Sequence, residues 1–188
     1  MAIKIFIDQG HNPGNPNAGA EGNGYREQDL VYEIGIRLAA LLRQNENFEV
    51  RLSRNTPDEI LGTSNAESLR ARVDAANTWG ADFFISLHAN ASTITSASGS
   101  EGYAYSADSP GYRMGLDLLE QLNLATGLPN RGMFVRPSLY VLRKTAMPAV
   151  LMELGFITNA QDAEKMAQQP ELFARGLYRG ILQYYGLL

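Results

Sequence analysis

Two histidines and one glutamate are the residues of this chain best suited to chemistry. His11 and His88 are the only histidines, and Glu153 stands within the apolar stretch AVLMELGF. A carboxylate in apolar surroundings is unfavourable unless it is paired or bound to a metal. A histidine after a strand, taken alone, is more often a loop or capping residue than a ligand, so a site is indicated only if the three lie together.

All three residues lie at the ends of predicted strands. An apolar, β-branched run predicts a strand over residues 3–8, which leads into His11. A second strand, over residues 81–89, holds His88 near its end, and the stretch around Glu153 is a third. Ligands bind outside the carboxyl ends of strands in open α/β sheets. We therefore expect the three ionisable groups at one edge of one sheet.

The elements that position these residues alternate along the chain. The strand around Glu153 covers residues 148–156, and further strands are predicted over residues 48–54, 102–106 and 139–144. Apolar residues at helical spacing predict helices around residues 28–42, 69–76, 112–126 and 172–185. About six strands in alternation with helices indicate an α/β fold of the three-layer α/β/α type. Its twisted sheet would be mostly parallel, with helices on both faces.

The composition is that of one globular domain, which we predict to span residues 1–188. The chain is 45 % hydrophobic, carries a net charge of −4 and has no long block of one sign, so no nucleic-acid partner is expected. Without cysteine, a metal would be bound by His, Asp or Glu. The apolar runs fall short of the roughly 18 residues of a membrane span. The start MAIKIFID lacks the layout of a signal peptide.

Glu27 begins the first predicted helix, and its role has two interpretations. A carboxylate at a helix N-terminus is favourable in itself, and that is the simpler interpretation. Two imidazoles, one carboxylate and a water are also a known composition of catalytic zinc sites, and Glu153 would then be free to act as a base. The spacing alone does not choose between the two.

Seven segments in order closely resemble the zinc-dependent N-acetylmuramoyl-L-alanine amidases of the amidase_3 type. They are IFIDQGHNPG, GYREQD, SLRARVDAAN, ADFFISLHANAS, GYAYS, NRGMFVRPSLYVLRKTAMPAV and LMELGFITN, and the likeness runs from Ile3 to about Ile181. In that family a histidine after the first strand, a glutamate opening a helix and a histidine in H-A-N bind zinc. The resemblance therefore implies that His11, Glu27 and His88 are the metal ligands.

The same resemblance implies that Glu153, in the family's V-E-x-G-F-like motif, is catalytic. It also implies one Zn²⁺ and hydrolysis of peptidoglycan at the amide between N-acetylmuramic acid and L-alanine of the stem peptide, by a zinc-activated water. Such a protein acts on the cell wall as an autolysin or endolysin, whether secreted, periplasmic or phage-released. In the turn around His11, Gln9 and Asn12 replace the family's usual proline and glycine.

Five further polar residues receive weaker interpretations. Asn90, Arg131 and Arg136 are candidate substrate-binding residues, although an Asn after a strand and charges in loops more often serve turns and solvation. Asp8 is a candidate acceptor for an imidazole N–H. Arg72 is expected to form a structural ion pair.

Several alternatives remain open. A zinc peptidase or carboxypeptidase on a similar fold, or a catalytically inactive wall-binding domain, would share these features. A serine hydrolase using Ser86 next to His88 is disfavoured because no G-x-S-x-G motif is present. Regulated relatives carry an inhibitory helical insertion where this chain has room for one helix, within residues 106–130, so we expect an open site. The sequence predicts neither the oligomeric state nor the preferred stem peptide.

Overall fold

A sheet of six strands, in the order β4-β1-β5-β8-β6-β7, organises the computed structural model, which describes residues 2–188. Its strands are β1 (Ile3–Gln9), β4 (Phe48–Leu52), β5 (Phe83–Asn90), β6 (Ser100–Ala104), β7 (Asn130–Val135) and β8 (Ala149–Phe156). Two short strands, β2 (Glu21–Gly22) and β3 (Tyr25–Arg26), form a separate antiparallel hairpin. The helices are α1 (Glu27–Arg43), α2 (Asn65–Trp79), α3 (Pro110–Thr126), α4 (Tyr140–Lys144), α5 (Ala160–Gln168) and α6 (Pro170–Tyr184).

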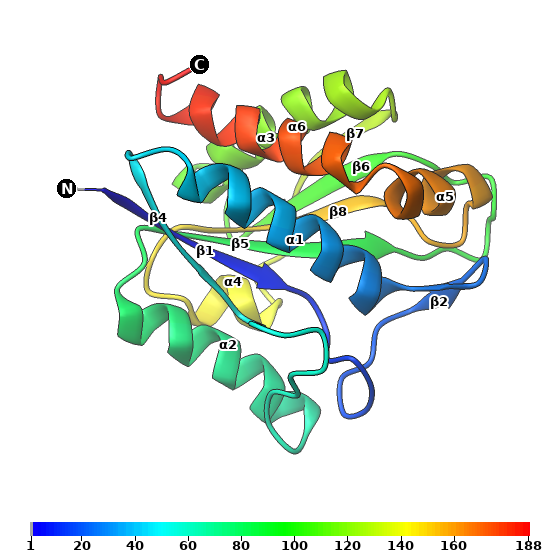
Figure 1. Cartoon of the computed structure of the whole chain (residues 1–188), viewed down its shortest axis with the longest axis horizontal. Helices are drawn as coiled ribbons and strands as arrows, with labels where there is room; N and C mark the ends of the chain where they lie inside the picture. The colour runs from blue at the N-terminus through cyan, green and yellow to red at the C-terminus, as the bar shows by residue number, and fades with distance from the viewer. Residues whose placement is uncertain (1) are drawn as a thin grey trace.

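The sheet is mostly parallel, as predicted. Strand β1 pairs in parallel with β4 and β5, β5 with β8, and β6 with β7, whereas β6 and β8 are antiparallel. Helices α1, α3, α5 and α6 cover one face and α2 and α4 lie against the other (Figure 1). The predicted three-layer α/β/α architecture is therefore confirmed.

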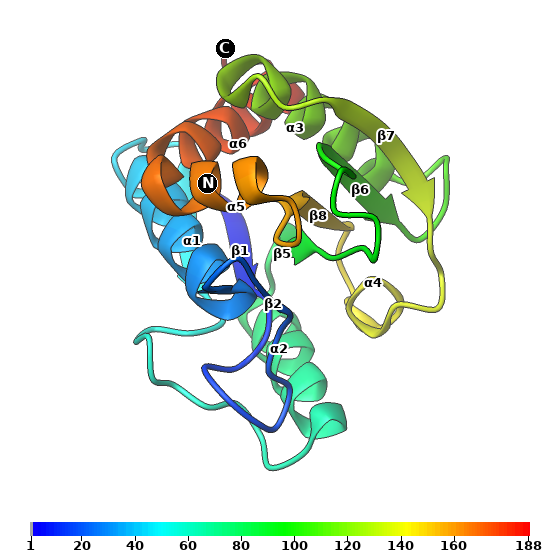
Figure 2. The ribbon, with the colours of Figure 1, turned by 90° about the vertical axis from the view of Figure 1, so that its right-hand side faces the viewer.

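Two apolar clusters hold the layers together. The larger cluster joins the sheet to α1, α3 and α6, and includes Ile34, Leu118 and Leu177, none of them exposed. The smaller one joins the opposite face to α2 and α4 through Phe84 and Val141. Both clusters exclude water from the sheet and leave its carboxyl edge, seen in Figure 2, to the polar loops.

The strand predicted over residues 139–144 is wrong, because this segment forms the short helix α4. Val141 and Leu142 are adjacent and both buried, whereas neighbouring residues of a strand point to opposite faces. The Thr145 hydroxyl donates to Val141 O at 2.8 Å and helps to end the helix. A short apolar run fits either structure, so periodicity could not decide.

The sixth strand is instead β7, in a segment expected to be a loop. Met133 is the buried residue of β7, so the apolar alternation of a strand is missing. Backbone pairing with β6 makes the strand. Met133 fits against two glycines: a Cβ at Gly102 in β6 would lie 2.3 Å from its Sδ, and one at Gly115 in α3 would lie 2.3 Å from its Cε. The thioether of Met133 therefore occupies space that is open only because positions 102 and 115 are glycines.

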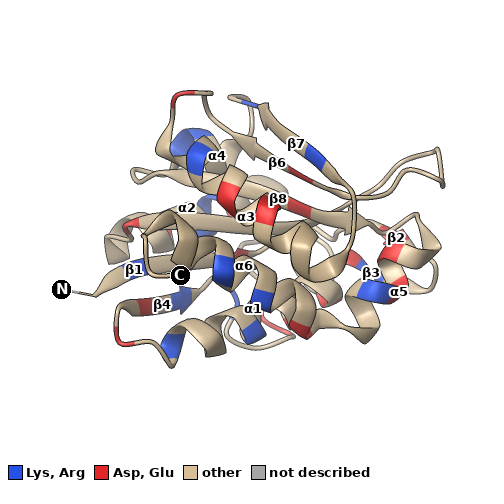
Figure 3. Ribbon diagram, turned by 90° about the horizontal axis from the view of Figure 1, so that it is seen from above, with Lys and Arg blue, Asp and Glu red and all other residues tan. Residues whose placement is uncertain are grey.

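The helix predicted over residues 112–126 is present as α3, which starts slightly earlier. The Ser109 hydroxyl accepts a hydrogen bond from Tyr112 N at 3.2 Å and caps the helix. Helix α3 packs on α6. Within residues 2–188, no helix combines the length and apolarity that a membrane span requires. Residues of both charge signs are interspersed over the elements (Figure 3).

Candidate metal centre

Arg72 of α2 holds the turn that carries His11. Its guanidinium donates to four acceptors on that turn: Asp8 Oδ1 at 2.7 Å, Gln9 O at 2.6 Å, His11 O at 2.5 Å and Asn12 Oδ1 at 3.2 Å. The ion pair predicted for Arg72 is thus formed with Asp8, and both side chains are 1 % exposed. These bonds fix His11 in a left-handed conformation, with φ at +67°.

Asp8 does not accept a hydrogen bond from an imidazole, so that prediction is wrong. Its second oxygen accepts from the Ser86 hydroxyl at 2.7 Å, which also directs Ser86 away from a serine-hydrolase role with His88. Burial raises the pKa of the Asp8 carboxyl, but the charge of Arg72 and the hydrogen bonds from Ser86 and Arg72 outweigh it and lower that pKa.

Gln9 and Asn12, the two departures from the family's turn, fasten it to the segment after β4. Gln9 Oε1 accepts from the Ser53 hydroxyl and from Arg54 N, each at 3.1 Å. Asn12 Oδ1 accepts from Leu61 N at 3.1 Å. These side-chain hydrogen bonds therefore hold the turn against the segment that follows β4.

Glu27 is the first residue of α1, and both its oxygens are engaged. Oε2 accepts from Ala20 N at 2.9 Å and Oε1 accepts from Ala89 N at 3.0 Å. Burial raises the pKa of the Glu27 carboxyl, but hydrogen bonds from His11 and His88 more than offset this, so its pKa lies far below the ordinary value. Glu27 is a fixed, ionised carboxylate.

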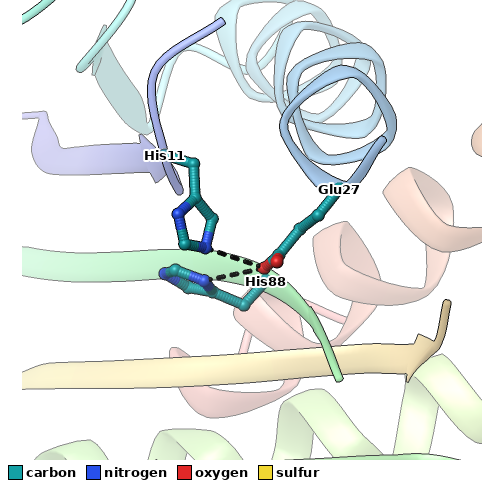
Figure 4. A group of neighbouring side chains, drawn as sticks. All are labelled: His11, Glu27 and His88. Atoms are coloured by element: carbon teal, nitrogen blue, oxygen red, sulfur yellow. Dashed lines mark hydrogen bonds and ion pairs between the residues drawn. The ribbon is translucent and has the colours of Figure 1, made fainter. Parts of the chain in front are cut away.

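The side chains of His11, Glu27 and His88 converge (Figure 4). Nε2 of His11 lies 3.1 Å and Nδ1 of His88 lies 3.0 Å from Glu27 Oε1. One ligand atom from each residue falls within 4.8 Å of the others. The His88 ring can reach this position because residue 10 is a glycine: a Cβ there would lie 2.4 Å from His88 Cε1. Two nitrogens and one carboxylate oxygen suit a zinc-type ion, and the histidine side chains keep about a fifth of their surface exposed, at 21 % and 19 %.

Glu153 lies next to this cluster. It is the register partner of His88 on the neighbouring strand β8. Its Oε2 is buried and has no hydrogen-bond partner within residues 2–188. Burial, followed by the negative charges of Glu27 and Glu101, raises the pKa of the Glu153 carboxyl to about 8. An unpaired carboxylate on the strand next to His88 is well placed to exchange a proton.

Glu101 is a residue that sequence reasoning missed. It lies opposite Glu153 on β6 and is 7 % exposed. Its carboxylate accepts from Asn90 Nδ2 at 2.9 Å, from the Tyr103 hydroxyl at 2.5 Å and from Arg131 Nε at 2.8 Å. Its position just before the predicted strand 102–106, in a Gly/Ser-rich segment, made it look like a solvated loop charge. Predicting that Glu101 lies opposite Glu153 requires knowing that β6 and β8 are neighbours, and the sequence pattern did not indicate this.

The three candidate substrate residues therefore differ in their surroundings. Asn90 and Arg131 are both bonded to Glu101. The guanidinium of Arg136 lies 5.5 Å from the centre of the Tyr103 ring and, within the described chain, pairs with no carboxylate. Of the two arginines, Arg131 is paired with Glu101, whereas Arg136 has no ion-pair partner among residues 2–188.

Residues 5–183 match the family model of the N-acetylmuramoyl-L-alanine amidases. The chain belongs to this family. Over 98 % of its length it is 37 % identical to the N-acetylmuramoyl-L-alanine amidase CwlM of Bacillus licheniformis, 70 % of which is covered. It is 36 % identical to the sporulation-specific amidase of Bacillus subtilis, again over 98 % of this chain and 69 % of the relative.

A solved amidase structure has the same fold. The catalytic domain of CwlV, an N-acetylmuramoyl-L-alanine amidase from Bacillus (Paenibacillus) polymyxa, superposes with a TM-score of 0.86 at 29 % identity, covering 99 % of both chains. The amidase fold and family membership thus agree with the resemblance carried by the seven segments.

Proposed function

We propose that residues 1–188 form a single catalytic domain that hydrolyses the amide between N-acetylmuramic acid and L-alanine in peptidoglycan. The observation that carries this proposal is the convergence of His11, Glu27 and His88 beside the unpaired carboxylate of Glu153, in a chain of the amidase family. The site of action would be the bacterial cell wall, where the named relatives act as amidases.

His11, Glu27 and His88 would hold one Zn²⁺. Bound zinc polarises a carbonyl and lowers the pKa of water towards roughly 7. Glu153 would accept the proton of the attacking water and return it to the departing nitrogen of L-alanine. Because Glu153 Oε2 has no hydrogen-bond partner among residues 2–188, no hydrogen bond to that part of the chain must be broken before it takes that proton.

The residues around Glu153 would orient the stem peptide. Arg136 offers a free guanidinium, which matches a peptide carboxylate. Arg131 is 41 % exposed and bonds to Glu101 through Nε, which leaves other N–H groups of its guanidinium for the substrate. Asn90 would act by keeping Glu101 in place, because its Nδ2 donates to Glu101 while its Oδ1 already accepts from Ala91 N at 2.9 Å.

A peptidoglycan digest tests this proposal against its alternatives. The amidase reaction releases new N-terminal L-alanine and leaves the glycan strands bare. New amino termini from other residues, or free C-terminal residues, would assign the chain to the peptidases or carboxypeptidases. Binding to walls without any product would assign it to inactive wall-binding domains. Loss of activity with a chelator, and recovery with zinc, tests the metal separately.

A further inference from the structure

A polar cleft opens at the same edge of the sheet as the candidate metal centre. Its volume is about 680 Å³, within the range of about 300–1,000 Å³ that is usual for small-ligand sites. Hydroxyl and amide side chains line it, and no charged residue does. A neutral hydrogen-bonding surface of this size differs from the charged surroundings of Glu153, which include Glu27 and Glu101.

The walls of this cleft continue from the three elements that carry the proposed active residues. One wall is the β2–β3 hairpin, which runs directly into Glu27. The second is the loop over residues 91–99, which follows His88. The third, over residues 158–161, follows the strand that holds Glu153. A ligand in the cleft would therefore sit close to the amide being cut.

The walls are fastened to one another. Asn23 Nδ2, in the hairpin, donates to Ile157 O at 2.8 Å. Asn159 Nδ2 donates to Thr95 O at 3.1 Å and links the second and third walls. The cleft thus has a fixed shape before any ligand arrives, which reduces the entropy lost on binding.

Other side chains in the cleft remain free. Among residues 2–188, no protein group bonds to the side chains of Thr95, Ser96 or Gln161, and all three residues are exposed. Ile94, on the same loop, is 65 % exposed. Hydroxyl and amide groups that donate and accept, next to an apolar side chain, complement a sugar ring with hydroxyls, an N-acetyl group and apolar C–H faces. A stem peptide, with its carboxylates, would call for cations instead.

We propose that this cleft binds uncharged N-acetylated sugars of the glycan strand that flank the muramoyl unit under attack. The inference rests on the proposed amidase function and adds to it a recognition site for the strand. Because the cleft is open, a long strand can cross it without threading its end.

Paired substrates test the cleft. One is a single muramoyl unit with its stem peptide, and the other is a short glycan strand bearing the same peptide. The wild-type chain should show a lower KM for the strand. The double variant T95A/Q161A should raise the strand KM about 10-fold, as expected for two lost hydrogen bonds, and leave the single-unit KM unchanged. T56A/Q168A, which removes the same side chains at exposed positions outside the cleft, is the matched control.

Three results would overturn the glycan site: equal effects of T95A/Q161A on both substrates, no effect on either, or an effect that follows peptide length. Binding of peptide-free glycan strands, measured by calorimetry, separates this inference from the amidase proposal. If neither substrate is cut, but the strands bind and T95A/Q161A weakens that binding, the glycan-binding proposal is supported and the amidase proposal is contradicted. If both substrates are cut and the strands bind wild type and variant equally, only the glycan-binding proposal is contradicted.

Discussion

At the scale of single residues, Glu153 has the environment of a catalytic base and an unfavourable one for folding. Its Oε2 is buried without a partner, and two further carboxylates, Glu27 and Glu101, lie near it. In the metal-free protein, ionising Glu153 therefore opposes folding. A cation held by His11, Glu27 and His88 would offset part of that repulsion.

Glu153→Gln should abolish turnover and stabilise the metal-free protein. The pKa of Glu153 rises from its ordinary 4.5 to about 8 on folding, so the wild type loses stability as the pH rises through this window. The glutamine side chain of the variant does not ionise, so the variant does not lose stability in this way. Urea unfolding of chelator-treated protein should show the variant ahead by about 1 kcal/mol or more at pH 8, with a smaller gap at pH 5. Equal gaps at both pH values would contradict the assignment, and zinc content should be unchanged.

The Asp8–Arg72 pair makes the opposite contribution. The pKa of Asp8 is lowered on folding, so the pair contributes stability above the ordinary value of 3.8, and this is lost as the pH falls below it. Arg72→Ala should cost about 3–5 kcal/mol, because it leaves a buried carboxylate unpaired.

Arg72→Lys is the informative companion, because it retains the charge and loses the planar fork that grips four acceptors of the His11 turn. We expect it to fold, to be less stable and to bind zinc more weakly than wild type in a competitive dye titration. Normal zinc affinity in this variant would show that the turn needs no guanidinium.

At the scale of elements, the β2–β3 hairpin connects the Glu27 ligand to the strand of the base. A Cβ at Gly22 would lie 2.6 Å from Ile157 O, so the two backbones can approach only because Gly22 has no side chain. Asn23 Nδ2 bonds to the same carbonyl. Any displacement of the hairpin would move the start of α1 and hence Glu27.

Gly22→Ala should therefore loosen the hairpin and lower stability by about 1–3 kcal/mol, as other overpacking substitutions do. The glycan preference should fall as well, because the hairpin is a wall of the cleft. Gly14→Ala is the matched control, since nothing lies within 4 Å of a Cβ there. The two proteins should differ in thermal unfolding, and equal melting temperatures would contradict the close approach.

The elements also show how far sequence reasoning reached. The strands that lead to His11, His88 and Glu153 have continuous apolar runs, and the edge where they end followed from the topology of α/β sheets. The structure of two short peripheral segments could not be predicted in this way. Helix α4 contains strand-forming residues, and its packing against α2 makes it helical. Strand β7 lacks apolar alternation, and its pairing with β6 makes it a strand. Glu101 was missed for the same reason, since its importance depends on register with Glu153.

At the scale of the whole molecule, the candidate metal centre joins segments that are far apart in the sequence. His11 follows β1, Glu27 starts α1 and His88 lies near the end of β5, so an ion bound there would tie three elements at one point. The chain has no cysteine, and no disulfide can perform that task. Metal binding and folding should therefore be linked.

Removal of zinc should lower the melting temperature, and zinc should restore it in proportion to the logarithm of its free concentration. At 100 times the dissociation constant the gain is about 2.7 kcal/mol for an ion that binds the folded state alone. Calorimetry in a zinc series checks this, with His88→Ala as the control that should not respond. A melting temperature independent of zinc would argue against a site at these three residues.

The sulfur of Met133 makes the edge of the sheet sensitive to oxidants. It fills the space left by Gly102 and Gly115, where a Cβ on either glycine would come within 2.3 Å of the thioether. Methionine sulfoxide is larger and polar, so its formation would push α3 and β6 away from β7. Because β7 lies at the edge of the sheet, the thioether comes within reach of peroxide whenever that strand frays. If the chain acts at the cell wall, as proposed above, oxidation of this one side chain would limit how long the fold lasts, and reduction of the sulfoxide would extend it.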